Sequence, residues 1–447
     1  MSFAHPIDTV PALITANIPS FVALILERLQ ESGYQAFVVG GAIRNAYLNR
    51  PIVDWDVATS ASPEEIKSVF KDERFFALKH GTVTLVSSRQ QVEITSFRGN
   101  GTSLEDDLSC RDFTINAMAF DPEKSEIDDP HGGRSDIRNK VIRAVGDPTA
   151  RFLEDPLRLL RAVRLATELW FRIDKRTLEA LPELAPLLLK VAPERIREEL
   201  VKILMGPKPS LGFNLMRRTG LLEQVLPELI EGVLKRQNHH HRHTIYKHIM
   251  ETTDRVDATP VSRLTALFHD IAKPRVREKI KGRWRFLGHE DASAELAVEI
   301  MNKFRFSRHM IEKVAFLIRH HVIGYRPQWS DAAVRRLIRR VGKENIMDLI
   351  RFRRADVLAH GLGHPEEALL CELDKRIKVQ LEKSLPVDKR DLAINGDTVM
   401  EVLALKQGPQ VGKILSELTE KVTDHPHLNT DNQLISLLKK MKQTESA

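Results

Sequence analysis

Residues 36–56 read AFVVGGAIRNAYLNRPIVDWD, and this stretch decides the fold of the first part of the chain. Its apolar start, residues 36–39, predicts a strand, and Gly40-Gly41 predicts a tight turn into a helix. Such a turn presents backbone N–H groups and a helix N-terminus to a triphosphate, and Arg44 is near enough to neutralise part of its charge. A plain strand-to-helix connection is the alternative interpretation.

Two carboxylates, Asp54 and Asp56, close the same stretch. Residues two apart in a strand point to one face, roughly 6 to 7 Å apart at Cα, so this pair can bind two Mg²⁺ ions. Ions held there would activate an attacking 3′ hydroxyl and stabilise a leaving pyrophosphate. Glu93, in a predicted strand over residues 92–97, is a candidate third catalytic carboxylate, although a strand residue that faces solvent is the alternative.

The periodicity of the chain indicates an α+β protein. Up to about residue 145, strands such as residues 82–86 lie between amphipathic segments, and we expect a head domain with a small mixed sheet. From Pro156 onward apolar residues recur at three and four spacing, so the remainder is expected to be all helical. With 447 residues and 29% charged content, the chain is long enough for several domains and too polar for a membrane protein.

Charge and cysteine content narrow the function class. A net charge of +7 fits a polyanionic partner, and basic residues crowd into residues 275–285 (RVREKIKGRWR), where solvated surface and RNA contact are both open. Cys110 and Cys371 match no disulfide framework or zinc finger. The N-terminus carries no secretory signal pattern, so a cytoplasmic protein is expected.

A basic stripe follows Asp155, which is suited to N-cap a helix that begins at Pro156. Arg158, Arg161 and Arg164 recur every three residues along one face of that helix. The Asp155 carboxylate could accept from the amine of cytosine or adenine, which uracil and guanine replace by a carbonyl. A solvated amphipathic helix is the alternative.

These motifs resemble, in order, those of the polymerase beta nucleotidyltransferase superfamily, and specifically the class II tRNA nucleotidyltransferases with the bacterial poly(A) polymerases. The residues that carry the resemblance are GGAIRNAYLNRPIVDWD (40–56), CRDFTINA (110–117), EDPLRLLR (154–161) and PERIREEL (193–200). The resemblance implies addition of nucleotides to the tRNA acceptor end from CTP, and from ATP where the complete CCA is made. It also implies nucleotide contacts from Arg111, Asp112, Asn116, Asp155 and the three arginines that follow.

Three departures from the family pattern matter. Asn45 stands where the family usually has Asp, and Cys110 replaces a common arginine, but neither change removes a metal ligand. Only residues 99–103 remain where CCA-adding members carry a long flexible loop, which indicates the CC-adding branch and a separate A-adding enzyme that acts afterwards. An A-adding enzyme or a poly(A) polymerase is the alternative, and residues 79–97 lack the extra length that we associate with the latter.

A second constellation lies in the helical part. Adjacent His and Asp on a helix can ligate or bridge metals, and further imidazoles can complete one or two sites. The order of these residues resembles the HD phosphohydrolase superfamily, which implies a divalent transition metal and hydrolysis of 2′,3′-cyclic or 2′ phosphates. The candidate ligands are His248, His269, Asp270, His289, His320, His321 and Asp356.

We expect four domains: a nucleotidyltransferase head over 20–148, a helical neck over 149–235, an HD domain over 236–375 and an RNA-contacting helical tail over 385–447. Two rival functions stay open. One is an HD-type phosphohydrolase whose head only delivers RNA, and the other is a non-catalytic RNA-binding protein, which the intact Asp54 and Asp56 pair argues against.

Overall fold

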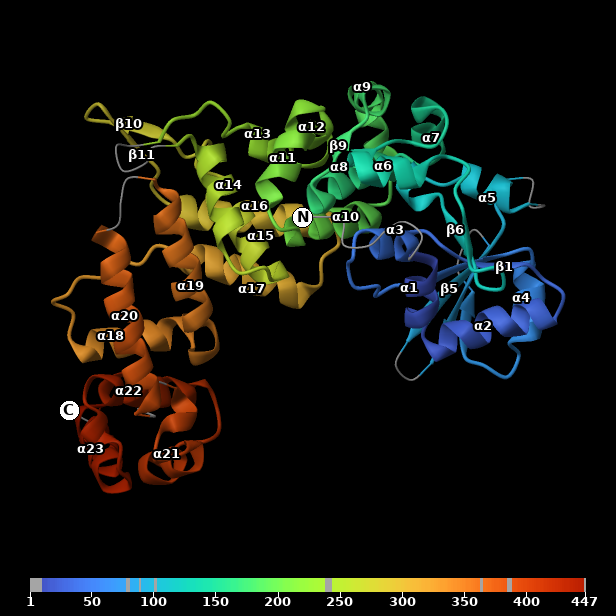
Figure 1. Ribbon diagram of the computed structural model, residues 1–447. Helices are drawn as coiled ribbons and strands as arrows, with labels where there is room; N and C mark the ends of the chain where they lie inside the picture. Colours follow the sequence, from blue (N-terminus) through green and yellow to red (C-terminus); the bar gives the residue numbers. More distant parts are fainter. Residues whose placement is uncertain are drawn as a thin grey trace. The chain divides into compact units, whose positions relative to one another are not determined.

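The computed structural model describes residues 10–77, 81–87, 90–99, 103–237, 243–361, 365–383 and 388–445. The chain forms two compact units, residues 1–227 and 228–447 (Figure 1). The first combines a sheet with helices, and the second is mainly helical, which confirms the predicted α+β class. The centre of the short loop, residues 100–102, lies outside the described residues.

A seven-stranded mixed sheet with the order β3-β4-β5-β2-β1-β6-β7 organises the first unit. Every neighbouring pair is antiparallel except β2 and β5, which run parallel and put Asp56 beside Glu93. The strands are β1 (Ala36–Val39), β2 (Asp56–Thr59), β3 (Phe75–Ala77), β4 (Thr82–Val86), β5 (Gln91–Ser96), β6 (Ala119–Asp121) and β7 (Glu126–Asp128). The predicted strands at 36–39, 82–86 and 92–97 are therefore confirmed, the last shifted by one residue.

The helices of the sheet-containing part begin with clear local signals. Ser62 and Glu65 form a capping box at the start of α4, and Ser103 caps α5 through a bond from the Asp106 N–H. These helices are α1 (Val10–Asn17), α2 (Ser20–Glu31), α3 (Gly41–Tyr47), α4 (Pro63–Val69), α5 (Leu104–Ser109) and α6 (Gly133–Asn139).

Helices with one buried apolar face complete the first unit. They are α7 (Pro148–Glu154), α8 (Leu157–Leu169), α9 (Lys175–Leu184), α10 (Pro193–Met205), α11 (Pro209–Arg218) and α12 (Leu221–Val225), followed by α13 (Pro227–Ile230). Helix α8 packs against α10 and α11, and the Gly212 position on α11 has no room for a Cβ, which would lie 2.7 Å from Ile203 Cγ2. Close packing of α8 on α10 fixes the arginine stripe relative to the PERIREEL segment.

The described residues of the second unit form mainly helices, together with a hairpin. The helices are α14 (Ile245–Arg255), α15 (Pro260–Phe268), α16 (His289–Lys303), α17 (Arg308–His320), α18 (Asp331–Val341), α19 (Lys343–Ala359), α20 (Pro365–Glu382), α21 (Gly396–Leu403), α22 (Pro409–Asp424) and α23 (Asp431–Glu445). One apolar core joins α17 to α20, and another joins α21 to α23. Buried Arg335 of α18 donates to the Thr423 carbonyl at 2.6 Å, which fixes the end of α22 against the preceding core.

The expectation of an all-helical remainder was wrong in two places. Strand β9 (Arg172–Ile173) pairs in parallel with β8 (Val141–Ile142), and β10 (Glu278–Ile280) pairs with β11 (Arg283–Arg285) as a hairpin. Val276, Ile280 and Trp284 recur at a spacing of four, which imitates a helix. Lys281 and Gly282 both have positive φ, as a two-residue type I′ hairpin turn requires.

Within the described part of the chain, no single helix combines the length and apolar character needed to cross a membrane, and only the bent pair α1 and α2 passes on length and composition together.

Candidate functional site

The acidic cluster of the head forms where β2 begins. Asp56 is the first residue of β2 and lies beside Glu93 of β5. We had expected Asp54 in the same strand, but it precedes β2 by two residues. Burial, the charge of Glu93 and the charge of Asp54 raise the pKa of the Asp56 carboxyl to about 6, although Arg111 opposes this effect. Concentrated carboxylate oxygens suit a hard divalent cation, because such an ion offsets their mutual repulsion.

The Gly-Gly turn brings backbone against this cluster. Gly40 has φ +76°, and a Cβ added there would lie 3.2 Å from Arg111 Nη1 and 3.6 Å from Asp56 Oδ2. Only glycine adopts this conformation without strain and leaves that space open. Helix α3 starts at Gly41, so its free N–H groups lie next to the acidic cluster and to Arg111.

Arg44 is fixed by two amide side chains. Its Nη1 donates to Asn116 Oδ1 at 2.6 Å, and its Nε and Nη2 donate to Asn45 Oδ1 at 3.3 and 3.1 Å. Burial lowers the pKa of Arg44, with Glu168 opposing this effect, and the guanidinium stays charged at neutral pH. Asn45, which replaces the family's usual Asp, therefore orients Arg44 without neutralising it.

The second motif, CRDFTINA (110–117), is held by two buried carboxylates, those of Asp107 and Asp112. Arg111 makes a two-point contact with fully buried Asp107, with Nε and Nη2 at 3.0 and 2.9 Å from Oδ2. Asp112 accepts from the Phe113 N–H at 2.8 Å and from Asn116 Nδ2 at 3.1 Å, and it pairs with Arg161 at 3.1 Å. Burial raises the pKa of Asp112, but Arg161 and these hydrogen bonds outweigh it and lower the pKa overall.

The arginine stripe of α8 is turned toward protein rather than toward open solvent. Arg158 donates to Glu154 Oε2 and to the Cys110 carbonyl, both at 2.9 Å, and Arg164 pairs with buried Glu199 at 2.7 Å. The side chains of Arg158 and Arg164 are only 12% and 16% exposed. The stripe thus joins α8 to the second motif and to α10, which corrects the idea of a purely solvated face.

Asp155 lies at the junction of α7 and α8. Pro156 occupies the N-cap position of α8, one residue later than expected, yet Asp155 Oδ1 still accepts from the Leu157 N–H at 3.2 Å. Both carboxylate oxygens also accept from Arg195 of α10, at 3.1 and 2.8 Å. Burial raises the pKa of Asp155, but Arg195 outweighs it and keeps the carboxylate ionised.

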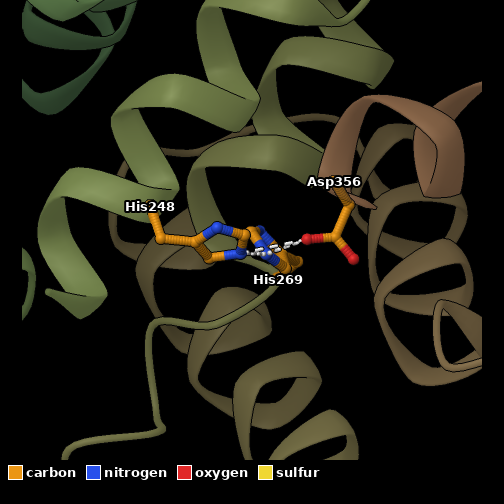
Figure 2. Close-up of side chains that lie close together, drawn as sticks. All are labelled: His248, His269 and Asp356. Carbon is orange, nitrogen blue, oxygen red and sulfur yellow. Dashed lines mark hydrogen bonds and ion pairs between the residues drawn. The ribbon is translucent and has the colours of Figure 1, made fainter. Parts of the chain in front are cut away.

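A second group of ligand side chains lies in the second unit. Figure 2 shows His248 of α14, His269 just after α15 and Asp356 of α19 pointing toward one another. His248 Nε2 is 3.2 Å from His269 Nε2 and 3.0 Å from Asp356 Oδ1, and all three side chains are buried. Three donors at this separation can hold one metal ion.

Asp270 extends this group to a second possible ion. Its Oδ2 lies 3.3 Å from Nε2 of both His248 and His269, and its Oδ1 lies 3.5 Å from His289 Nε2 and 3.9 Å from His321 Nε2. Asp270, His289 and His321 form a further group of three donors within 4.8 Å. Asp270 thus faces both groups and is placed to bridge two ions.

The imidazoles of this centre carry opposite pKa shifts. Burial lowers the pKa of His269, but Asp270 and Asp356 outweigh it and raise the pKa to about 9. Burial, reinforced by His269, lowers the pKa of His321 to about 3. With protons alone the centre therefore carries positive charge beside its buried carboxylates, and a cation bound there would take the place of that charge.

His320 does not join the centre. Its ring lies edge-on to the Phe316 ring, with the ring centres 4.5 Å apart. Helix α17 ends at His320, and the next residue, His321, is the one that faces Asp270. His360, which the sequence analysis missed, comes closer, with Nε2 3.8 Å from Asp356 Oδ1. Its position four residues after Asp356 on one helical face was the available signal. Nothing in the sequence indicated that Glu199 pairs with Arg164 or that Arg195 pairs with Asp155.

Comparison with known proteins assigns the family. The poly A polymerase head domain model matches residues 36–143, the "Probable RNA and SrmB-binding site of polymerase A" model matches 170–232, and the "tRNA nucleotidyltransferase domain 2" model matches 282–438. A CCA-adding enzyme from Enterococcus faecalis is 32% identical and covers 94% of this chain and 95% of its own length. A CCA-adding enzyme from Pediococcus pentosaceus is 31% identical and covers 94% of this chain and 98% of its own length.

A solved structure agrees with these relatives. The Bacillus stearothermophilus CCA-adding enzyme in complex with CTP is 28% identical, with a TM-score of 0.69 over 94% of this chain and 97% of that one. Since relatives above 30% identity match over nearly their whole length, this chain belongs to the family of CCA-adding enzymes, which are template-independent tRNA nucleotidyltransferases.

Proposed function

We propose that this chain adds cytidine from CTP to the 3′ end of tRNA, with Asp54, Asp56 and Glu93 as its catalytic carboxylates. The observation that carries the proposal is the parallel register that puts Asp56 beside Glu93, next to the bare backbone of Gly40. The 3′ oxygen forms a bond to the α-phosphorus of CTP, its proton is released, and the bond from that phosphorus to the β-phosphate oxygen breaks to give pyrophosphate. Magnesium held by the carboxylates supplies the positive charge that this step needs.

The side chains around the turn bind the rest of the nucleotide. The free N–H groups at the start of α3, from Gly41 onward, receive the triphosphate, with Arg44 and Arg111 beside it as permanent positive charges. Asp112 and Asn116 orient Arg161 and Arg44, and they shape the sugar pocket. The Bacillus stearothermophilus relative was solved with CTP, which supports a nucleotide of this kind.

Side chains rather than a template select the base. Asp155, held by Arg195, accepts from the cytosine amine, while Arg158, Arg161 and Arg164 contact the incoming nucleotide and support the pocket. A base that presents a carbonyl instead of the amine leaves a charged acceptor unpaired, which costs about 1–3 kcal/mol. Cytosine and adenine pass this test, and uracil and guanine do not.

The short segment 99–103 supports addition of two cytidines, followed by a separate A-adding enzyme. The test is incorporation of labelled CTP and ATP, alone and together with Mg²⁺, onto tRNA that ends before the first C, before the second C and before A. Two cytidines and no adenosine would support the proposal. Full CCA addition would keep the enzyme class and reject the CC-only assignment, and adenosine alone would reassign the chain to the last step.

The division into a head (20–148), a neck (149–235), an HD domain (236–375) and a tail (385–447) remains part of the proposal. In this division the neck and the basic helical surfaces hold the acceptor arm of tRNA through its phosphates, which gives affinity with little sequence reading, and the tail makes a further RNA contact. Arginines also recur along α18 and α19, and three of them are held within the second unit: Arg335 by the Thr423 carbonyl, Arg336 by Asp424 and Arg353 by Asp356.

A second function is favoured by the histidine and aspartate centre. We propose that it binds one or two divalent transition metals and hydrolyses a phosphate ester, because buried imidazoles with carboxylates are the donors that such ions prefer. Release of phosphate or opening of 2′,3′-cyclic CMP by the metal-loaded protein tests this function. No turnover with Mn²⁺, Co²⁺, Ni²⁺ or Zn²⁺ would leave the centre as a structural site only.

A further inference from the structure

The hairpin of β10 and β11 links two ligand segments of the histidine and aspartate centre. It follows Asp270 and Lys273 and precedes His289, the first residue of α16. In Figure 1 it extends away from the helices of its own unit, and all three residues of β10 are exposed. An exposed two-stranded hairpin of this size gains little from burial, so its residues are available for binding.

The hairpin is strongly basic. Residues 275–285 contain six cations, and one carboxylate, Glu278. Arg275, which precedes β10, is neutralised by Glu231, with Nη2 2.7 Å from Oε1. Among the residues that the structure describes, no carboxylate lies within ion-pair distance of the other five cations, which are Arg277, Lys279, Lys281, Arg283 and Arg285. This concentration of unneutralised charge favours a polyanion.

An aromatic ring lies within the charged surface. The guanidinium carbon of Arg277 lies 3.5 Å from the centre of the Trp284 ring, and Lys279 Nζ lies 5.9 Å from it. Bases of single-stranded nucleic acid stack on aromatic rings and on guanidinium planes, with cations placed to meet the phosphates. A membrane surface would instead require a continuous apolar face, and only Ile280 is an exposed large apolar residue within the two strands.

Both ends of the hairpin are joined to the metal-ligand cluster. Lys273 pairs with Asp270 at 2.6 Å and lies 5.6 Å from the ring centre of Phe286. His289 Nδ1 is 2.8 Å from the Phe286 carbonyl, and a donor at Nδ1 leaves Nε2 free to face Asp270. The segments that flank the hairpin on both sides therefore contact ligand residues of the centre.

We infer that the hairpin binds the single-stranded 3′ end of an RNA and directs its terminal phosphate to the histidine and aspartate centre. The inference deepens the proposed hydrolytic function and rests on it: the substrate is an RNA end rather than a free nucleotide. A free nucleotide can reach the ligands without the hairpin, whereas a chain gains affinity from each additional phosphate that meets a cation.

The experiment compares two substrates on the full-length, metal-loaded protein: a twelve-nucleotide RNA that ends in a 2′,3′-cyclic phosphate, and 2′,3′-cyclic CMP. In the Lys279→Glu/Arg283→Glu variant, kcat/KM for the RNA should fall about tenfold or more, and kcat/KM for the mononucleotide should change less than about twofold. Lys303→Glu/Lys375→Glu is the control, because it makes the same change of charge at two other exposed lysines. Trp284→Ala should also lower the RNA rate alone.

Equal losses on both substrates, or an equal loss in the control, would overturn the inference. If the wild-type protein turns over neither substrate, the hydrolytic function fails, and the hairpin is judged by binding of the same RNA. The slope of log affinity against log salt should then become shallower by about 1.4 in the hairpin variant. An unchanged slope, or loss only of binding to phosphatidylserine vesicles, would reject RNA as the partner.

Discussion

The acidic cluster of the head and the histidine and aspartate centre of the second unit are both groups of charged side chains, but they differ in donor chemistry and in burial. The head offers carboxylate oxygens only, and two of its three carboxylate residues, Asp54 and Glu93, are exposed. The second centre buries His248, His269 and Asp270 almost completely. Oxygen donors near solvent suit magnesium that arrives with a nucleotide, and buried imidazoles suit a resident transition metal.

The largest expected effect concerns the head. Asp56→Ala should lower cytidine incorporation by on the order of 10³-fold or more, because it removes a ligand at the reacting phosphate. The measurement is the initial rate of labelled CTP incorporation onto tRNA that lacks its 3′ end. Glu126→Ala, at an exposed acidic position on β7, is the matched control and should stay near the wild-type rate. A residual Asp56→Ala rate within about tenfold would count against this role.

The second comparison uses metal content. The wild-type protein should retain up to two equivalents of Co²⁺ or Mn²⁺ after desalting, and Asp270→Ala should retain the least, because Asp270 faces both groups of ligands. His320→Ala should match the wild type, since its ring lies outside both groups. Elemental analysis of the desalted proteins gives the answer, and equal metal content in all three would rule out this centre as the binding site.

A smaller effect is expected for base selection. Asp155→Asn keeps the shape but removes the charged acceptor, so the preference for CTP over UTP should fall about ten- to a hundredfold. The ratio of the two kcat/KM values is the readout. Asp147→Asn, which alters a helix cap on α7 and no base contact, should leave the ratio unchanged. An unaltered ratio in Asp155→Asn would move base selection to other side chains.

The smallest effect is on stability. Since the folded pKa of Asp56 is raised to about 6, its ionisation destabilises the metal-free fold as pH rises from about 4 through 6. Asp56→Asn should therefore be more stable than the metal-free wild type at pH 7.5, by on the order of 1 kcal/mol, and no more stable at pH 4. Thermal unfolding at both pH values tests the sign, and a less stable Asn variant at pH 7.5 would contradict it.

Local patterns in the sequence were sufficient for much of the head. Strands β1, β4 and β5 follow from short apolar or alternating runs. The parallel register that puts Asp56 beside Glu93 joins two strands that are distant in the sequence, and neither strand alone predicts it. The pairing of Asp155 with Arg195 could not be predicted, because the two residues are forty apart in the sequence and meet only through the packing of α8 on α10. The hairpin was missed because its apolar residues recur at a spacing of four.

The histidines show the same limit at finer scale. The sequence offers His320 and His321 together, and only the end of α17 decides which imidazole faces Asp270. His360 lies on the same helical face as Asp356, but a single histidine four residues from an aspartate is too common to single out. Which side chains meet depends on packing between helices, which periodicity alone does not specify.

The most direct test of the central claim measures both activities on the same three proteins: wild type, Asp56→Ala and Asp270→Ala. Our account predicts that Asp56→Ala loses cytidine transfer and keeps hydrolysis of 2′,3′-cyclic CMP, whereas Asp270→Ala loses hydrolysis and keeps transfer. Loss of transfer in Asp270→Ala, with Asp56→Ala unaffected, would contradict the account and make the second unit the catalytic part of the chain.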